Sequence, residues 1–133
     1  MRLIDLTTGK RGVKLPGSLA DNVTLMEFSN DGKFLASAAS GGRFINVYDC
    51  AGEGSLVRTL SLAHSPTALS LSSSSASKEK AHTVSLAACC DSGRVAFFRF
   101  DDDAGEDAEV TEHTLNVSAD AGAFKAVAWK LFF

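Results

Sequence analysis

Short apolar runs separated by turn residues are the feature that most constrains how this chain can fold. Three of these runs end in an apolar or aromatic residue followed by aspartate, at Ile4-Asp5, Tyr48-Asp49 and Phe100-Asp101. Asp5 and Asp49 are 44 residues apart, and Asp49 and Asp101 are 52 residues apart. A pattern that returns at such intervals indicates a repeated structural unit.

Residues 22–62 contain the clearest unit. Alternating and short apolar runs predict four strands in it, at 22–29, 34–39, 43–49 and 55–62. The Asp31-Gly32 pair between the first two runs supplies the positive φ of a tight hairpin turn, and glycines also separate the later runs. No helical period is present, so this segment is predicted to be one antiparallel meander.

The pattern recurs less regularly in the next part of the chain. Strands are predicted at 67–71, 83–89, 94–101 and 110–117. The polar run SSSSASKEKAH at 72–82 is predicted to be a loop that tolerates insertion, and its length accounts for the longer second interval. An Asp-Ser-Gly turn that ends at Gly93 precedes the third of these strands.

A unit of four strands that repeats about every 40–45 residues is typical of a propeller blade. We therefore expect an all-β chain that forms a partial propeller. A closed propeller needs about four to eight blades, so the chain would be a piece of a larger protein or would pair its open edges with another chain, and we favour the piece. The expected units are the end of a preceding blade at 1–18, a whole blade at 19–64, a second blade at 65–118 that includes insertion 72–82 and acidic loop 101–109, and the start of a further blade or a truncated end at 119–133.

The segment LMEFSNDGKFLASAASGGRFINVYDC resembles the core of a WD repeat. In that family an apolar strand ends in Phe-Ser, an Asp-Gly-Lys turn follows, and a later strand closes on Trp-Asp. Here Tyr48-Asp49 replaces Trp-Asp. The resemblance implies structural roles within blades for Asp5, Asp31, Gly32, Tyr48, Asp49, His64, Asp91, Gly93 and Asp101.

The chain departs from the WD pattern at the polar residues that stiffen a blade. The family's Gly-His is absent before the first whole blade, where residues 15–18 read LPGS, and the second blade keeps only His64. The turn aspartate is replaced by Gly41 or Gly42 in the first blade, whereas Asp91 fits it in the second. We expect His64 and Asp91 to come close and to form a structural hydrogen bond.

A narrower resemblance is to the nucleolar WD-repeat subunit of the early, transcription-linked subcomplex of the small-subunit processome. It rests on the order of an Ala-rich strand, the RFINV run at 43–47 and a Gly-Arg-Val strand that ends in Phe at 93–100. This resemblance implies a place in pre-ribosomal RNA processing and small-subunit assembly, in the nucleus and nucleolus.

Composition and charge argue against a nucleic-acid footprint and a membrane segment. The chain of 133 residues has 13 basic and 16 acidic side chains, a net charge of −3, and its acids concentrate at 101–109. No apolar run approaches the roughly 18–20 residues of a membrane span, and no secretory h-region begins the chain. We expect an intracellular protein, with the nucleus favoured and the cytoplasm open.

No catalytic centre, metal site or cofactor is expected. The histidines fall in or beside predicted loops or edges: His64, His82 and His113. The cysteines are Cys50 and the adjacent Cys89-Cys90, an odd count that indicates a reducing compartment. A zinc site needs two ligand clusters, so buried small apolar side chains are the better interpretation of the thiols.

The candidate interaction residues are charges on or beside the third strands. Arg43, Arg94 and Arg99 would contact RNA or an acidic protein, with an exposed charge at a blade edge as the alternative. The acidic run begins with Asp101, Asp102 and Asp103 and would dock a basic partner, with a solvated loop as the alternative. This run lacks the ligand spacing of a calcium loop.

The expected function is that of a protein-interaction scaffold and not of an enzyme, because propellers present wide rigid faces without preset chemistry. The expected partners are other proteins of a large complex, a pre-ribosomal particle among them, and direct contact with RNA stays open. No small-molecule substrate is expected. The alternatives are a generic WD adaptor in ubiquitin ligation or chromatin and, from another class, a hydrolase built on a propeller.

Overall fold

The computed structural model describes a chain built of β-strands and the connections between most of them. The described residues are 2–4, 6, 8–9, 11–15, 23–39, 41–50, 54–75, 82–91, 93–102 and 111–116. This part of the chain contains ten strands and no helix. The expectation of an all-β fold is therefore confirmed for it.

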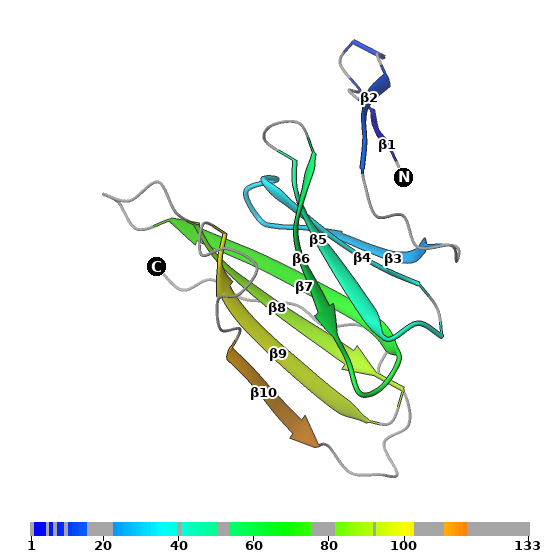
Figure 1. The fold of residues 1–133 in the computed structure, drawn as a ribbon, viewed down its shortest axis with the longest axis vertical. Coiled ribbons are helices and arrows are strands. Elements are labelled where there is room, and N and C mark those ends of the chain that lie inside the picture. Colours follow the sequence, from blue (N-terminus) through cyan, green and yellow to red (C-terminus); the bar gives the residue numbers. More distant parts are fainter. Residues whose placement is uncertain are drawn as a thin grey trace.

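The strands form two four-stranded sheets and one hairpin (Figure 1). The hairpin pairs β1 (Arg2–Ile4) with β2 (Arg11–Lys14). The first sheet has the order β3 (Val23–Phe28), β4 (Phe34–Ala39), β5 (Phe44–Asp49) and β6 (Ser55–Ser61). The second sheet has the order β7 (Pro66–Ser75), β8 (His82–Cys90), β9 (Arg94–Asp101) and β10 (Thr111–Asn116). Each sheet is an antiparallel meander, as the spacing of apolar runs predicts.

Turns that contain glycine reverse the chain between neighbouring strands of each sheet. Between β3 and β4, Gly32 has a φ of 73°, a left-handed conformation that residues with a side chain rarely adopt. Its amide donates a hydrogen bond of 2.9 Å to the Ser29 carbonyl. Gly93, between β8 and β9, has the same φ of 73°, and its amide donates to the Cys90 carbonyl. Gly32 and Gly93 thus lie in the turns that were predicted at these positions.

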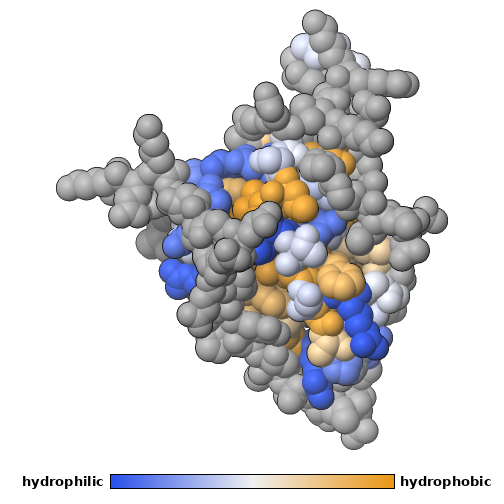
Figure 2. Space-filling view, in the orientation of Figure 1, coloured by the Kyte–Doolittle hydropathy of each residue, from blue (hydrophilic) through white to orange (hydrophobic). Residues whose placement is uncertain are grey.

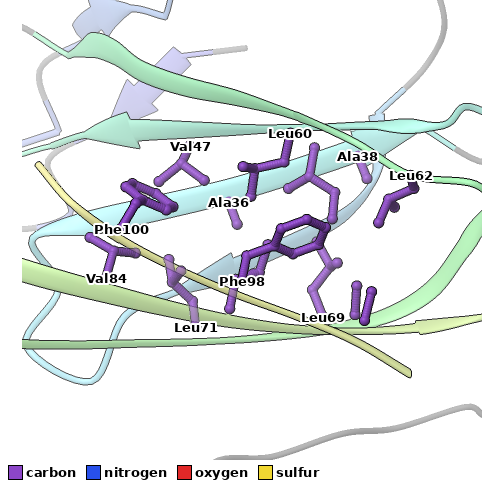
Figure 3. Close-up of a cluster of buried hydrophobic side chains, with 14 of the residues drawn as sticks. Ala36, Ala38, Val47, Leu60, Leu62, Leu69, Leu71, Val84, Phe98 and Phe100 are labelled. Carbon is purple, nitrogen blue, oxygen red and sulfur yellow. The ribbon is translucent and has the colours of Figure 1, made fainter. Parts of the chain in front are cut away.

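One apolar core joins the first and second sheets (Figure 3). Its members come from the facing sides of both sheets and are almost fully shielded from solvent. The buried members are Phe34, Ala36, Ala38, Ile45, Val47, Leu60, Leu62, Leu69, Leu71, Val84, Leu86, Ala88, Ala96, Phe98 and Phe100.

Both sheets contribute small and large side chains to this core. Strand β4 presents Ala36 and Ala38, whereas β9 presents Phe98 and Phe100 (Figure 3). On β9 the exposed Arg99 alternates with these two phenylalanines, because successive side chains of a strand point to opposite faces. Close packing of small and large side chains fills the space between the two sheets.

The sheets stack strand upon strand. Among the described strands, their backbones approach most closely along the first strand of each sheet, β3 and β7. Farther along, the rings of Phe34 on β4 and His82 on β8 meet edge to face, with centroids 5.9 Å apart. The guanidinium of Arg58 on β6 lies 5.6 Å from the centroid of the Phe100 ring on β9. Corresponding strands of the two sheets are therefore opposite or nearly opposite one another.

The residue that follows the N-terminal hairpin packs on the outward face of the first sheet, which is the face that points away from the second sheet. Leu15, which follows β2 directly, is 1% exposed. It packs against Leu35 of β4 and Tyr48 of β5 in a cluster separate from the main core, with Cys50 beside them. The first sheet therefore carries apolar contacts on both of its faces.

The prediction of a loop at 72–82 is wrong at both of its ends. Strand β7 continues to Ser75, and β8 already begins at His82. Ser72 and Ser73 pair with Ser85 and Val84 of β8 and are buried. A serine run carries no apolar alternation, so only the pairing partner and the neighbouring sheet reveal that it is a strand.

Several predicted features lie outside the described residues. They are Asp5, Asp103 and the rest of the acidic loop to residue 109, and the unit at 119–133. The described strands form open sheets, and they do not close into a ring.

Replacing Phe98 by alanine should destabilise the protein by about 3–5 kcal/mol, because the buried ring fills the space between the sheets. Urea unfolding monitored by circular dichroism measures the change. The exposed neighbour Arg99→Ala is the matched control and should alter stability by less than about 0.5 kcal/mol. Equal effects of the two substitutions would contradict a core that joins the sheets at β9.

Candidate functional site

Two groups of polar residues lie at opposite ends of the strands. At one end lie the β3–β4 turn, the ends of β5 and β9 and the start of β8. We call this the lysine end, after Lys33. At the other end lie the β4–β5 and β8–β9 turns and the β6–β7 connection, at the lower right of Figure 1. We call this the arginine end, after Arg43 and Arg94.

At the lysine end, the β3–β4 turn is stabilised by hydrogen bonds among its own residues. The Ser29 hydroxyl donates to Asp31 Oδ1 at 2.6 Å, and the Lys33 amide donates to the same oxygen at 3.0 Å. The Phe34 amide donates to Ser29 Oγ at 3.0 Å. Asp31 and Gly32 thus occupy the structural turn positions expected of them, and the turn is rigid enough to present its neighbours to the second sheet.

This turn also bonds to the second sheet. Asn30 Oδ1 accepts a hydrogen bond of 2.9 Å from the Ser73 amide, and the Ser72 hydroxyl lies 3.5 Å from the same oxygen. The Ser73 hydroxyl donates to Asp31 Oδ2. Partial burial alone would raise the pKa of Asp31, but the hydrogen bonds from Ser29, Ser73 and Lys33 together outweigh it and lower that pKa.

Lys33 lies at the centre of the lysine end and links the two sheets. Its ammonium is 3.1 Å from Asp102 Oδ2, at the end of β9, and 3.8 Å from Asp49 Oδ2, at the end of β5. It also lies 4.9 Å from the centroid of the Phe34 ring. The side chains of Lys33 and Asp102 are only 21% and 13% exposed, so the pair is poorly screened by solvent.

The backbone of β8 holds Asp102 in place. The His82 amide donates to Asp102 Oδ1 at 2.9 Å, and the Asp102 amide donates to the His82 carbonyl at 3.0 Å. Burial alone would raise the pKa of Asp102, but the hydrogen bonds from His82 and Lys33 and the positive charge of Lys33 lower it. Asp102 is therefore engaged within the molecule, and its contacts serve the packing of the sheets.

Asp102→Asn should weaken the protein at neutral pH by about 1 kcal/mol, because Lys33 loses its nearest carboxylate. The pKa of Asp102 is lowered in the folded protein, so its contribution is present above the ordinary value of 3.8 and is lost as the pH falls below it. Unfolding free energies of wild type and variant should therefore converge below pH 3.8. A constant difference from pH 7 to pH 3 would contradict this role, and Asp91→Asn is the control.

The arginine end is built from tight turns that lead into third strands. Arg43 and Arg94 are both exposed and each follows a glycine. The Arg43 carbonyl accepts a hydrogen bond of 2.7 Å from the Leu62 amide, which fixes the start of β5 to the end of β6. The exposed Phe44 stands next to Arg43, so this end combines positive charge with an aromatic ring.

A backbone contact joins the two connections that carry His64 and Asp91. The Asp91 amide donates to the Ser65 carbonyl at 3.0 Å. No hydrogen bond or ion pair between the His64 and Asp91 side chains is seen in the described part of the chain. Asp91 is exposed and His64 is partly exposed. The hydrogen bond that was expected between these two side chains is therefore not found, and the hydrogen bond between the two connections is a main-chain one.

The structure separates the candidate interaction residues. Arg43 and Arg94 lie at the arginine end, whereas Asp101 and Asp102 lie at the lysine end, where Asp101 Oδ1 accepts a hydrogen bond of 2.9 Å from Thr83. Arg99 lies within β9, exposed and two residues before Asp101, away from the arginine end. The five residues therefore do not form one surface, and only Arg43 and Arg94 share an exposed position at the same end.

Sequence reasoning missed the contacts that unite the lysine end. Lys33 and Asp102 are 69 positions apart, and Asn30 and Ser73 are 43 apart. The Asn-Asp-Gly-Lys turn signals a hairpin but carries no information about a partner in the next sheet. Tyr48 and Gly93 were placed correctly in a strand and a turn, since those roles depend on local sequence alone.

The thiols lie where the sequence indicates. Cys89 and Cys90 are buried, each 3% exposed, and Cys50 is partly buried. Burial raises the pKa of Cys89. Burial, assisted by the charge of Asp49, also raises the pKa of Cys50, and burial is the main cause of the raised pKa of Cys90. These thiols therefore act as small apolar side chains in the native protein.

An aromatic disulfide reagent at pH 8 should modify Cys50 slowly and leave Cys89 and Cys90 intact until the protein unfolds, because only thiolates react and buried thiols ionise poorly. Absorbance at intervals before and after addition of guanidinium measures the two classes. In a Cys50→Ser variant no thiol should titrate in the native state. Rapid modification of this variant without denaturant would show that β8 is more open than described.

Within the described residues, no group of three or more His, Cys, Asp or Glu side chains could hold a metal ion. The same part of the chain has no helix that could span a membrane. No protein-family model matches the chain, and no curated protein matches it.

Proposed function

We propose that this chain is part of a WD-type β-propeller and that it serves as a protein-interaction scaffold. The observation that carries the proposal is the relative direction of the strands in the two stacked sheets. Strands β3 and β7 lie side by side. They also run the same way, because Asn30, just after β3, bonds to Ser73, near the end of β7.

The two sheets have the same strand order, and their strands run in the same direction where the sheets stack. In such a stack, one face of the first sheet meets the opposite face of the second. The second sheet turns to the first the face on which Leu86 and Phe98 are paired. The matching face of the first sheet, on which Leu35 and Tyr48 are paired, points the other way. Rotation about a central axis relates successive propeller blades in this manner, so the arrangement supports a propeller rather than a two-sheet sandwich of like faces.

The scaffold role is supported by the contrast between the two ends. The charges of the lysine end are largely engaged in joining the sheets, through Lys33 and Asp102. The arginine end presents Arg43 and Arg94 to solvent. Rigid sheets with exposed turns suit a binding role, because the sheets hold the turns in a fixed geometry.

Within this class we propose a component of nucleolar pre-ribosomal RNA processing and small-subunit assembly. The support is the resemblance of residues 43–47 and 93–100 to strands of the processome subunit described above. Exposed arginines at equivalent turns, Arg43 and Arg94, would contact acidic proteins of such a particle, since opposite charges steer association. The proposed partners are proteins, and the proposed location in the cell is the nucleus.

Affinity purification of the tagged chain from cells of its source tests the proposal, with mass spectrometry of the recovered proteins. We expect factors of small-subunit assembly. The double variant Arg43→Glu with Arg94→Glu should recover several-fold less of them, whereas Arg99→Glu, an exposed arginine away from the arginine end, should match the wild type. Circular dichroism first establishes that all three chains fold alike.

Two other outcomes would overturn the proposal at different levels. Recovery of a cullin or histone complex without assembly factors would replace the nucleolar function by that of a generic adaptor. A hydrolytic activity that is lost when His64, His82 or His113 is replaced would contradict the scaffold function itself.

A further inference from the structure

Strand β6 forms one edge of the first sheet. Among the described strands it pairs with β5 alone, so its other side is an open edge. At the end of this ladder the Leu62 amide donates a hydrogen bond to the Arg43 carbonyl. In an antiparallel pair, residues that bond across the ladder alternate with residues whose main chain points away from it. The amides and carbonyls of Thr59 and Ser61 therefore point to the open edge.

A hollow of about 320 Å³ lies along this part of β6. Four successive side chains line it: Leu56, Val57, Arg58 and Thr59. Val57 and Arg58 face the second sheet, since Val57 packs against the main core and Arg58 lies by the Phe100 ring. Leu56 and Thr59 lie on the outward face by their register with β5. Because the hollow touches side chains of both faces, it runs along the edge itself, where an added strand would lie.

The hollow combines apolar walls with the positive charge of Arg58. Leu56 is 39% exposed, and Val57 and Arg58 are partly exposed. The guanidinium of Arg58 lies 5.6 Å from the centroid of the Phe100 ring, a contact that holds the charge beside the edge. Hydrophobic residues reach the surface near the middle of the view in Figure 2, where Figure 1 places β6.

Two features of β6 restrict which strands can pair with it. Its register with β5 steps from Arg58 to Leu56, so Val57 between them is the extra residue of a β-bulge. Bulges and inward-pointing charges protect sheet edges from indiscriminate pairing. An apolar strand would bury the guanidinium of Arg58 without a counter-charge, which costs free energy. A strand with a carboxylate at this position avoids that cost, so the charge selects an acidic partner.

We propose that the open edge of β6 binds an extended, acidic segment of a partner protein by strand addition. The segment pairs its main chain with Thr59 and Ser61, places a carboxylate beside Arg58 and an apolar side chain beside Leu56. A guanidinium has five N–H donors, so it can bind a carboxylate in addition to its contacts within the chain. The hollow lies along a strand and not at the turns of the arginine end, so it is a second interaction surface.

Selection from a library of random short peptides displayed on phage tests the proposal on the full chain. We expect the recovered peptides to carry Asp or Glu next to an apolar residue, and synthetic copies to bind in fluorescence anisotropy. Thr59→Pro should weaken their binding about tenfold, because proline removes an amide from the open edge. The variant should still fold, since proline is tolerated where the N–H of an edge strand points away from the sheet.

Matched controls separate strand addition from other binding. Thr59→Ala keeps the amide and loses only the hydroxyl, which donates to Asn46, so it should bind the peptides as the wild type does. Arg58→Glu should reject the acidic peptides and bind copies in which Lys replaces the acidic residue. Circular dichroism establishes that the variants fold alike. Methylation of alternate peptide amides tests the ladder on the unaltered protein: one set of positions should abolish binding and the other should not.

Three results would overturn the proposal. The first is a set of recovered peptides without acidic preference. The second is equal binding to wild type and Thr59→Pro, or equal binding of the two methylated sets. The third is self-association that Thr59→Pro abolishes while no peptide is recovered, which would assign the edge to a second copy of the chain. The proposed scaffold function would survive each of them, because it is judged by the partners recovered through Arg43 and Arg94.

Discussion

Apolar contact between the first and second sheets is the interaction on which the rest of the structure depends. A single four-stranded sheet leaves one or both faces in water, and burial of each large side chain contributes about 1.5–3 kcal/mol. The rings of Phe98 and Phe100 share one buried core with the small side chains of Ala36 and Ala38. Without this contact neither end of the sheets would have a defined shape.

The polar contacts of the lysine end fix the alignment of one sheet on the other more than they add to total stability. Hydrophobic packing is non-directional and would tolerate a slide of one sheet over the other. The bonds from Ser73 to Asn30 and Asp31, and the pair of Lys33 with Asp102, are satisfied in one alignment. They lie where the turns of both sheets meet, so they fix that alignment from one end.

The two sheets stack with their strands running in the same direction, and this explains why the first sheet has an exposed apolar face. When opposite faces of like sheets meet, the first sheet keeps a face that the second sheet does not cover. In the described part of the chain this is the face that exposes Met26 and Phe28. The arginine end is independent of this face, since Arg43 and Arg94 project from turns and not from a packed face.

The sequence by itself determined the strands and turns, because alternation of apolar residues and Asp-Gly or Ser-Gly pairs are local signals. It also placed the buried thiols Cys89 and Cys90. Only the tertiary structure decided that Ser72 and Ser73 belong to a strand and that Lys33 pairs with Asp102, 69 residues away. Those outcomes depend on which face of one sheet meets the next, and no local pattern encodes the choice of a distant neighbour.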